Sequence, residues 1–245
     1  MERLLSIKGN PDSGNLAVVI PGMSKSHGFN RLLTETLYES GQSVANSKSG
    51  VLSKNPYEFI NGLIDLCREK DVKSLSLIGM SLGGAAAVLY KDYLERAGLR
   101  VKRISTLVAP FHLNDLSRGV KFLRAIGGTF RKLSRDKTDN FARKYLNFDM
   151  VLSAEQVLNE LSNNPPSLDL KTPVLAVTTR SDVIIDHNLA MRSLRNRFLN
   201  VQEVQVEGKP VIGLVGVNKV GGHILADSAI PKVISVLQSF NSPSD

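Results

Sequence analysis

A serine flanked by two glycines, in the run Gly79-Met80-Ser81-Leu82-Gly83, is the clearest candidate for chemistry in this sequence. The run lies where a predicted strand over 74–79 turns directly into a predicted helix over 82–97. So tight a turn can hold a serine exposed in a strained conformation, and glycines fit where side chains would collide with the neighbouring strand and helix. The following helix points its positive end at the serine, which favours negative charge there. We therefore predict a nucleophilic serine, the alternative being an ordinary turn whose serine caps the helix.

Partners that could activate this serine follow further along the chain. A serine hydroxyl is a weak nucleophile near neutral pH, so it needs a base, and the base needs an orienting carboxylate. Asp182 comes just after a predicted strand over 172–178, and His223 lies on a glycine-flanked loop after a strand-like run. We predict that Asp182 orients His223 and that His223 is the general base. Asp186 is a second candidate for the acid, although a helix cap is the more typical role at its position.

The elements that would position these residues alternate between short β-rich runs and longer helical patterns. This alternation is typical of a mainly parallel central sheet flanked by helices, an α/β fold. The predicted strands cover 16–20, 43–47, 74–79, 101–108, 172–178 and 201–206. The predicted helices cover 31–39, 57–69, 82–97, 189–198 and 229–240. A chain of 245 residues is within the range of one such domain.

Residues 111–170 form a segment that is too long for a plain connection between two strands. We predict that it is a helical cap, or lid, inserted into a core made of 1–110 and 171–245. Ser153-Ala-Glu-Gln156 has the pattern of a capping box and predicts the start of a helix within the segment. The apolar positions of that helix are Val157, Leu158 and Leu161.

The positive charge of the chain is concentrated inside this predicted cap. Nine basic and two acidic residues lie between Arg118 and Lys144, and they account for most of the net charge of +8. A charge confined to one segment suggests that the segment faces an anionic substrate or a membrane surface. The alternative is a solvated cap that is basic for solubility alone.

Composition excludes several other classes of protein. Hydrophobic residues make up 42% of the chain and charged residues 22%, as in a globular protein rather than a disordered one. No apolar run is long enough for a signal peptide or a membrane span, so we expect a cytoplasmic protein. Cys67 is the single cysteine, which excludes an intrachain disulfide and a cysteine-based zinc site, and we expect it in the core. No metal and no cofactor is predicted.

From the strand before Pro21 to the last helix, the sequence resembles the α/β-hydrolase family, in particular its serine carboxylesterases and lipases with a cap insertion. The resemblance rests on the glycine-flanked serine at a strand-to-helix turn, the order serine, aspartate, histidine, and the place of the insertion. It implies a catalytic triad in which Ser81 is the nucleophile, His223 the general base and then the acid, and Asp182 the orienting carboxylate.

The resemblance also implies an oxyanion hole, formed by the backbone N–H groups of Met23 and Leu82. Many members have His-Gly where this chain has Pro21-Gly22, a change that keeps the glycine and the N–H after it. His112 follows a strand whose end should face the site, and His27 follows the oxyanion loop. Both are candidates for substrate contact, and the alternatives are a cap hinge for the former and a rim residue for the latter.

The expected activity is hydrolysis of a carboxylic ester, of a small molecule or a lipid, through an acyl-enzyme. A second hypothesis is a thioesterase or a lysophospholipase-like lipid esterase, whose basic lid holds the phosphates of an acyl carrier or rests on anionic lipid. A third is a non-enzymatic ligand sensor on the same fold, against which the complete set of Ser81, Asp182 and His223 argues. Nucleic-acid binding is not expected, because no recognition motif accompanies the charge.

Overall fold

The structure is a computed structural model. It describes residues 5–11, 14–22, 27–47, 56–111, 148–163, 168–180, 182, 185–208 and 225–241. Among the expected site residues, Met23, His112 and His223 lie outside this part of the chain, as does the whole basic segment between 118 and 144.

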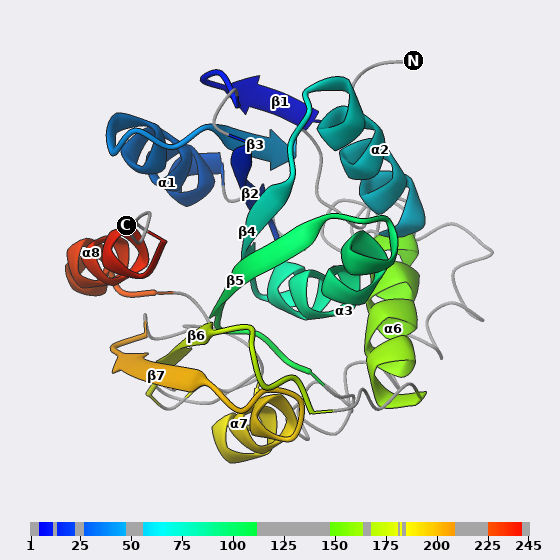
Figure 1. Cartoon of the computed structure of the whole chain (residues 1–245). Helices are drawn as coiled ribbons and strands as arrows, with labels where there is room; N and C mark the ends of the chain where they lie inside the picture. Colours follow the sequence, from blue (N-terminus) through cyan, green and yellow to red (C-terminus); the bar gives the residue numbers. More distant parts are fainter. Residues whose placement is uncertain are drawn as a thin grey trace, which may run out of the picture.

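The described strands form one sheet of seven, in the order β1-β3-β2-β4-β5-β6-β7 (Figure 1). Their bounds are β1 Leu5–Lys8, β2 Asn15–Ile20, β3 Val44–Ser47, β4 Ser74–Met80, β5 Arg100–Leu107, β6 Val174–Thr179 and β7 Val201–Val206. β1 pairs antiparallel with β3, and every other neighbouring pair is parallel. The predicted α/β architecture with a mainly parallel sheet is confirmed.

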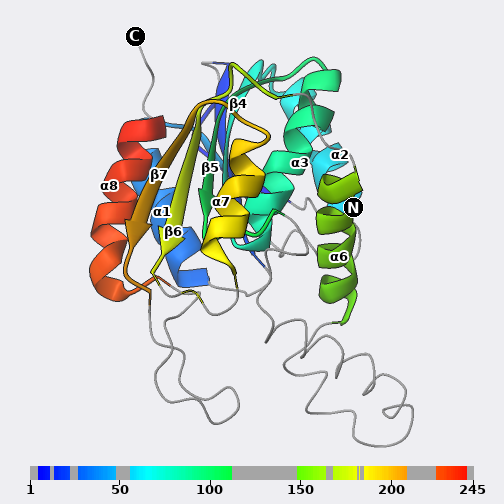
Figure 2. The same cartoon turned by 90° about the horizontal axis from the view of Figure 1, so that it is seen from below.

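Helices cover both faces of the sheet, as Figure 2 shows. One face carries α1 His27–Glu39 and α8 Ile230–Asn241, which the short 3₁₀ helix Asp227–Ala229 precedes. The other face carries α2 Pro56–Glu69, α3 Leu82–Arg96, α6 Phe148–Asn163 and α7 His187–Arg195. Because both faces are covered, central strands are continuous apolar runs: each residue from Leu16 to Ile20 is at most 3% exposed.

The strand order reverses at β2, since β3 lies on one side of it and β4 on the other. The chain leaving β2 enters α1 on one face, and the chain leaving β4 enters α3 on the opposite face. The two connections therefore diverge, and the carboxyl ends of β2 and β4 flank the crevice in which α/β proteins bind ligands. Pro21 and Ser81 are the first residues beyond these strands.

Two local predictions were wrong, and strand β1 was missed. α1 begins at His27 rather than at 31. The capping box does not begin a helix, because α6 already begins at Phe148 and Ser153 lies inside it. The helical apolar pattern continues upstream through Phe148 and Val151, and it outweighs the local capping signal.

Helix α6, which lies within the predicted cap, belongs to the helical layer over the sheet. α6 packs against α3, and its predicted apolar positions are buried. They are Val157, Leu158 and Leu161, at most 2% exposed. The boundaries of a cap over 111–170 stay a prediction.

A largely buried ion pair links Asp169, near the end of the predicted cap, to α3. The Nζ of Lys91 lies 2.8 Å from Oδ2 of Asp169 and 2.7 Å from Oε2 of Glu95. The side chains of Lys91 and Asp169 are 9% and 16% exposed. Oδ1 of Asp169 accepts hydrogen bonds from the N–H groups of Lys171 at 2.8 Å and Thr172 at 2.9 Å. Burial opposes ionisation of Asp169, but these donors outweigh it and hold the pKa of that carboxyl well below its usual range.

Asp169→Asn is expected to lower the free energy of unfolding by about 2–3 kcal/mol at pH 7, because it removes one partner of a buried pair. The carboxyl has a lower pKa in the folded chain than its ordinary 3.8. Its contribution is therefore present above that value and is lost as the pH falls through and below it. Urea unfolding at pH 7, 5, 4 and 3 should show the difference between wild type and variant shrinking toward low pH.

Asp71→Asn is the matched control for this measurement. Asp71 pairs with Lys73 at 2.5 Å, but their side chains are 84% and 74% exposed. Exposed pairs contribute little, so this variant should unfold like the wild type at every pH. A difference for Asp169→Asn that stays constant from pH 7 to pH 3 would show that its carboxylate charge is not the stabilising feature.

Candidate active site

Ser81 occupies a strained turn between β4 and α3. Its backbone has φ 52° and ψ −126°, in the region with positive φ that side-chain-bearing residues rarely adopt. The N–H of Ser81 donates to the carbonyl oxygen of Leu107 at 2.7 Å, and its carbonyl oxygen accepts from the N–H of Gly84 at 2.8 Å. The side chain makes no capping hydrogen bond to α3, so the helix-cap alternative is wrong. The predicted sharp turn is confirmed.

The turn is in close contact with the end of β2. A Cβ added to Gly22 would lie 2.8 Å from the carbonyl oxygen of Met80 and 2.9 Å from the Cβ of Ser81. A Cβ added to Gly83 would lie 2.6 Å from the carbonyl oxygen of Pro21 and would overlap the carbonyl oxygen of Ile20. Glycine is therefore required on both sides of the contact. The backbone just before Met23 is held against the serine, while the role of the Met23 amide stays a prediction.

Gly83→Ala is expected to destabilise the fold by about 3 kcal/mol, because the new methyl group meets backbone atoms that cannot rotate away. Gly62→Ala is its control. Gly62 lies within α2, and an added Cβ there meets nothing within 4 Å, so alanine should stabilise by about 0.5–1 kcal/mol. Thermal unfolding of both variants measures the contrast. Equal stability of the two would contradict the close approach at Gly83.

Leu82, the second predicted oxyanion donor, is the first residue of α3 and is 4% exposed. The N–H groups of the first helical turn have no acceptor within the helix, so this amide is available for another acceptor. The positive end of the α3 dipole lies at the same place. The surroundings of Ser81 therefore favour a negatively charged oxygen beside it.

Asp182 follows β6 by three residues and is half-buried. Oδ1 accepts from the N–H of Ile185 at 3.0 Å, and Oδ2 accepts from the hydroxyl of Thr179 at 3.4 Å. Asp186 instead caps α7, since its carboxylate accepts from the N–H of Leu189 at 3.1 Å. Thr179 was missed from the sequence, although a threonine ending the strand before a candidate acid is a signal for such a hydrogen bond.

Ser81 and Asp182 lie at the same edge of the sheet. β4 and β6 are parallel and are separated only by β5, so the residues that follow them lie at the same end of the sheet, two strands apart. Glu207 directly follows β7 at this edge, and it is hydrogen-bonded to Ala226 on the far side of the segment that contains His223. The N–H of Ala226 donates to the carbonyl oxygen of Glu207 at 3.1 Å, and Gly208 pairs with Leu225, which joins the two ends of 209–224.

Three further predictions concern two histidines and the cysteine. His27 begins α1, the helix that follows β2, and its contact with substrate stays a prediction, as does that of His112. Cys67 is fully buried, as predicted, and burial raises the pKa of its thiol to about 12. A thiol so protonated is no rival to Ser81 as a nucleophile.

Within the described ranges, no three His, Cys, Asp or Glu side chains lie close enough together to hold a metal ion. None of the described helices combines the length and the hydropathy needed to cross a bilayer.

Known proteins resemble this chain in structure and not detectably in sequence. No protein-family model matches the sequence, and no curated protein matches it. A monoacylglycerol lipase from Paleococcus ferrophilus superposes with a TM-score of 0.62 at 14% identity, over 98% of each chain. An esterase from Exiguobacterium antarcticum gives 0.63 at 14% identity, over 96% of this chain and 94% of the esterase. The Vlm2 thioesterase domain gives 0.56 at 17% identity, over 97% and 98%.

Proposed function

We propose that this chain, which has the α/β-hydrolase fold of the solved structures that it resembles, is a serine hydrolase that cleaves a carboxylic ester. The observation that carries the proposal is the conformation of Ser81, a residue with φ 52° at the carboxyl end of β4. Strain of this kind persists only where the surroundings enforce it, and it is concentrated at functional sites. The complete set of Ser81, Asp182 and His223 argues against a non-enzymatic sensor on the same fold, which would not need all three.

The proposed reaction proceeds in two steps through an acyl-enzyme. Oγ of Ser81 bonds to the ester carbonyl carbon as His223 takes the hydroxyl proton. The bond from that carbon to the alcohol oxygen then breaks, and His223 gives the proton to the leaving alcohol. Water attacks the acyl-enzyme in the same way, loses a proton to His223, and releases the acid as Oγ of Ser81 regains a proton.

The remaining groups orient the base and stabilise charge. Asp182 accepts a hydrogen bond from the imidazole of His223 and fixes its tautomer. The backbone N–H groups of Leu82 and Met23 bind the oxyanion, where each donor contributes about 10²–10³ in rate. Support comes from Gly22, whose close approach to Ser81 holds the backbone before Met23 beside the nucleophile.

Two classes of acyl donor are consistent with the neighbours. The lipase and the esterase point to an oxygen ester of a small molecule or a lipid, while the thioesterase domain keeps a thioester as the second candidate. We propose a cap within 111–170 over the site, whose basic segment would favour a phosphate-bearing acyl carrier or anionic lipid.

The test is hydrolysis of p-nitrophenyl esters of increasing acyl length, beside an acyl-CoA, by wild type and Ser81→Ala. Turnover that depends on Ser81 and reaches a maximum at one chain length would support the ester hydrolase. A higher kcat/KM for the acyl-CoA would favour the thioesterase. Ester turnover that survives in Ser81→Ala would refute the serine mechanism.

A further inference from the structure

Three exposed leucines lie together before the amino ends of β6 and β7. Leu168, Leu170 and Leu199 are 45%, 59% and 61% exposed, and the last two are the most exposed large apolar side chains in the described part of the chain. Asp169 and Phe198 form a parallel bridge. The N–H of Leu199 donates to the carbonyl oxygen of Asp169 at 2.9 Å, so the two segments that carry the leucines are adjacent. We call these three leucines the leucine patch.

Inward-pointing neighbours hold the leucine patch on the surface. Successive side chains of an extended segment point to opposite sides. Asp169 points inward to the Nζ of Lys91, and Phe198 is buried, so the leucines beside them point outward. The side-chain amide of Asn200 also donates to the carbonyl oxygen of Leu170 at 3.2 Å. The patch is therefore fixed by contacts of the folded chain.

Positive charge surrounds the leucine patch. The segments at the amino ends of β5, β6 and β7 contain six basic residues and one acidic residue. These segments are 97–103, 168–173 and 195–200. The acidic residue is Asp169, which is largely buried and paired with Lys91 at 2.8 Å. One basic residue, Arg195, is paired with Glu203 at 2.9 Å. This edge of the sheet is therefore basic around an apolar centre.

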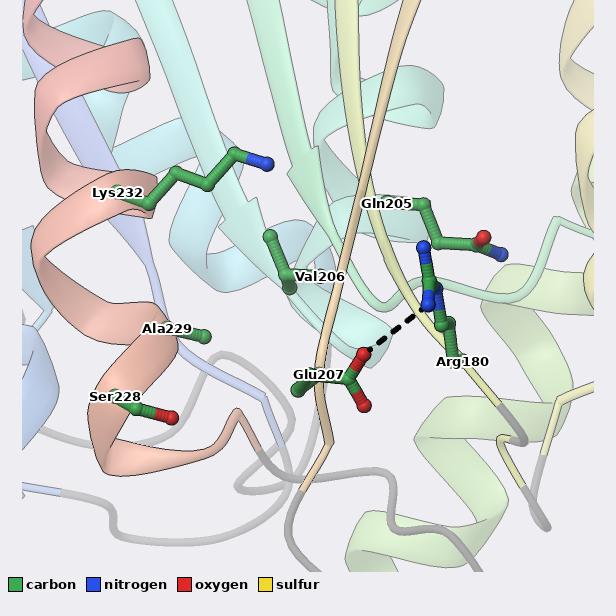
Figure 3. A pocket seen from close by; sticks show the side chains of 7 residues that line it. All are labelled: Arg180, Gln205, Val206, Glu207, Ser228, Ala229 and Lys232. Atoms are coloured by element: carbon green, nitrogen blue, oxygen red, sulfur yellow. Dashed lines mark ion pairs between the residues drawn. The ribbon is translucent and has the colours of Figure 1, made fainter.

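The leucine patch and Ser81 lie at opposite edges of the sheet. β4 to β7 are parallel, so residues that precede β6 and β7 lie at one edge, while Ser81 follows β4 at the other (Figure 2). The edge near Ser81 also has basic residues, but β7 separates Arg180 from Lys232 there, as Figure 3 shows. Arg180 is also paired with Glu207 at 3.4 Å. Those charges do not converge, and no apolar patch accompanies them among the residues that line the pocket.

We propose that the leucine patch and the basic residues around it bind the surface of an anionic phospholipid bilayer. Arg100 and Lys171, both exposed, contact the lipid phosphates, and the leucines enter the apolar region beneath them. Apolar patches rimmed by polar residues are typical of membrane and protein contacts. A bilayer supplies negative charge and an apolar layer together without a matching shape. An acidic protein would have to supply an apolar patch of its own.

Binding in this orientation leaves the crevice at Ser81 facing water, because the crevice lies at the other edge of the sheet. A substrate would then reach Ser81 from the aqueous phase. The lipid contact itself does not rest on the proposed hydrolase function, whereas this consequence for the substrate does.

Binding is tested by sedimentation with lipid vesicles, in Ser81→Ala protein so that no lipid is hydrolysed. The protein should bind vesicles of phosphatidylserine and phosphatidylcholine, and not vesicles of phosphatidylcholine alone. Arg100→Ala with Lys171→Ala should weaken binding about 20-fold, at about fivefold for each charge. Leu170→Ser with Leu199→Ser should weaken it about tenfold or more, because less apolar surface leaves water.

Each of these double variants has a matched control. Arg180→Ala with Lys232→Ala removes the same charge around the end of β7 (Figure 3). Leu32→Ser with Leu189→Ser replaces two leucines of α1 and α7 that are 40% and 39% exposed. Both controls should bind anionic vesicles as the parent protein does. Circular dichroism checks that every variant is folded.

Four results would overturn the proposal. Equal weakening by the variants and their controls would mean that vesicles respond only to net charge or to total apolar surface. Binding that survives in both edge variants would assign the contact to the basic segment between 118 and 144. Binding that only the charge variant weakens would exclude insertion of the leucines. Absence of binding to anionic vesicles would exclude the bilayer and leave an acidic protein as the partner.

The orientation is tested with wild-type protein and p-nitrophenyl acetate, a water-soluble ester. The value of kcat/KM should be the same with and without anionic vesicles, because the crevice faces water. Inhibition by vesicles that Leu170→Ser with Leu199→Ser relieves would show that the crevice faces the bilayer, contrary to the proposal. Failure to hydrolyse any test ester without vesicles would count against the hydrolase function, while sedimentation would still decide the lipid contact.

Discussion

Ser81→Ala is expected to lower kcat for the best p-nitrophenyl ester by about 10⁴–10⁶, close to the rate left by binding and the oxyanion hole alone. The reason is that the variant lacks the nucleophilic hydroxyl, and Cys67 cannot replace it, because this single cysteine is fully buried and burial raises the pKa of its thiol to about 12. Initial rates at pH 8, with wild-type protein in parallel, measure the effect.

Alanine keeps the Cβ of serine, so the fold should survive this substitution. The strain at φ 52° should also remain. Ser81→Gly separates strain from chemistry. Glycine adopts this backbone without steric cost, so the variant should be inactive and yet more stable than Ser81→Ala by about 1 kcal/mol. Urea unfolding of the three proteins gives the comparison. Equal stability of the glycine and alanine variants would mean that the turn is not strained.

A fluorophosphonate probe tests whether Ser81 is an activated nucleophile even where none of the test esters is a substrate. It phosphonylates an activated serine hydroxyl without needing the natural acyl group, so wild-type protein should be labelled and Ser81→Ala should not. Labelling at another residue would reassign the nucleophile. Absence of labelling in the wild type would favour the sensor hypothesis.

The central strands could be predicted from sequence because they are buried on both faces. Runs such as Leu16–Ile20 are apolar without interruption. The glycines around Ser81 could be interpreted as well, because they lie where two backbone segments approach closely. β1 could not be predicted in the same way. It has four residues with mixed burial, and it exists because it pairs with β3, a partner that no local pattern specifies.

Polar contacts between residues far apart in sequence could not be predicted either. Lys91 and Asp169 are far apart in sequence, and nothing in either neighbourhood indicates that they form a buried pair. The same holds for Arg180 and Glu207, which meet only because β6 and β7 are adjacent and in register. The residues of the proposed triad could be predicted from their types and their order along the chain. The residues that contact them could not, because those contacts depend on the register of the sheet.

The choice between Asp182 and Asp186 as the orienting acid can be decided by two asparagine variants. Asp182→Asn is expected to lower kcat by about 10⁴, because an amide that donates to the imidazole of His223 would hold the wrong tautomer. The amide oxygen can still accept from the N–H of Ile185, so the loop should keep its shape. Circular dichroism and urea unfolding check that the variant remains folded.

Asp186→Asn is the matched change at the helix cap. Asparagine caps helices as well as aspartate does, so this variant should keep both its activity and its stability, while Asp186→Ala should lose about 1 kcal/mol of stability and no activity. The reverse pattern, with Asp186→Asn inactive and Asp182→Asn active, would transfer the acid to Asp186. Because the carboxylate of Asp186 already accepts the N–H of Leu189 in the first turn of α7, that outcome would also require the loop to rearrange during catalysis.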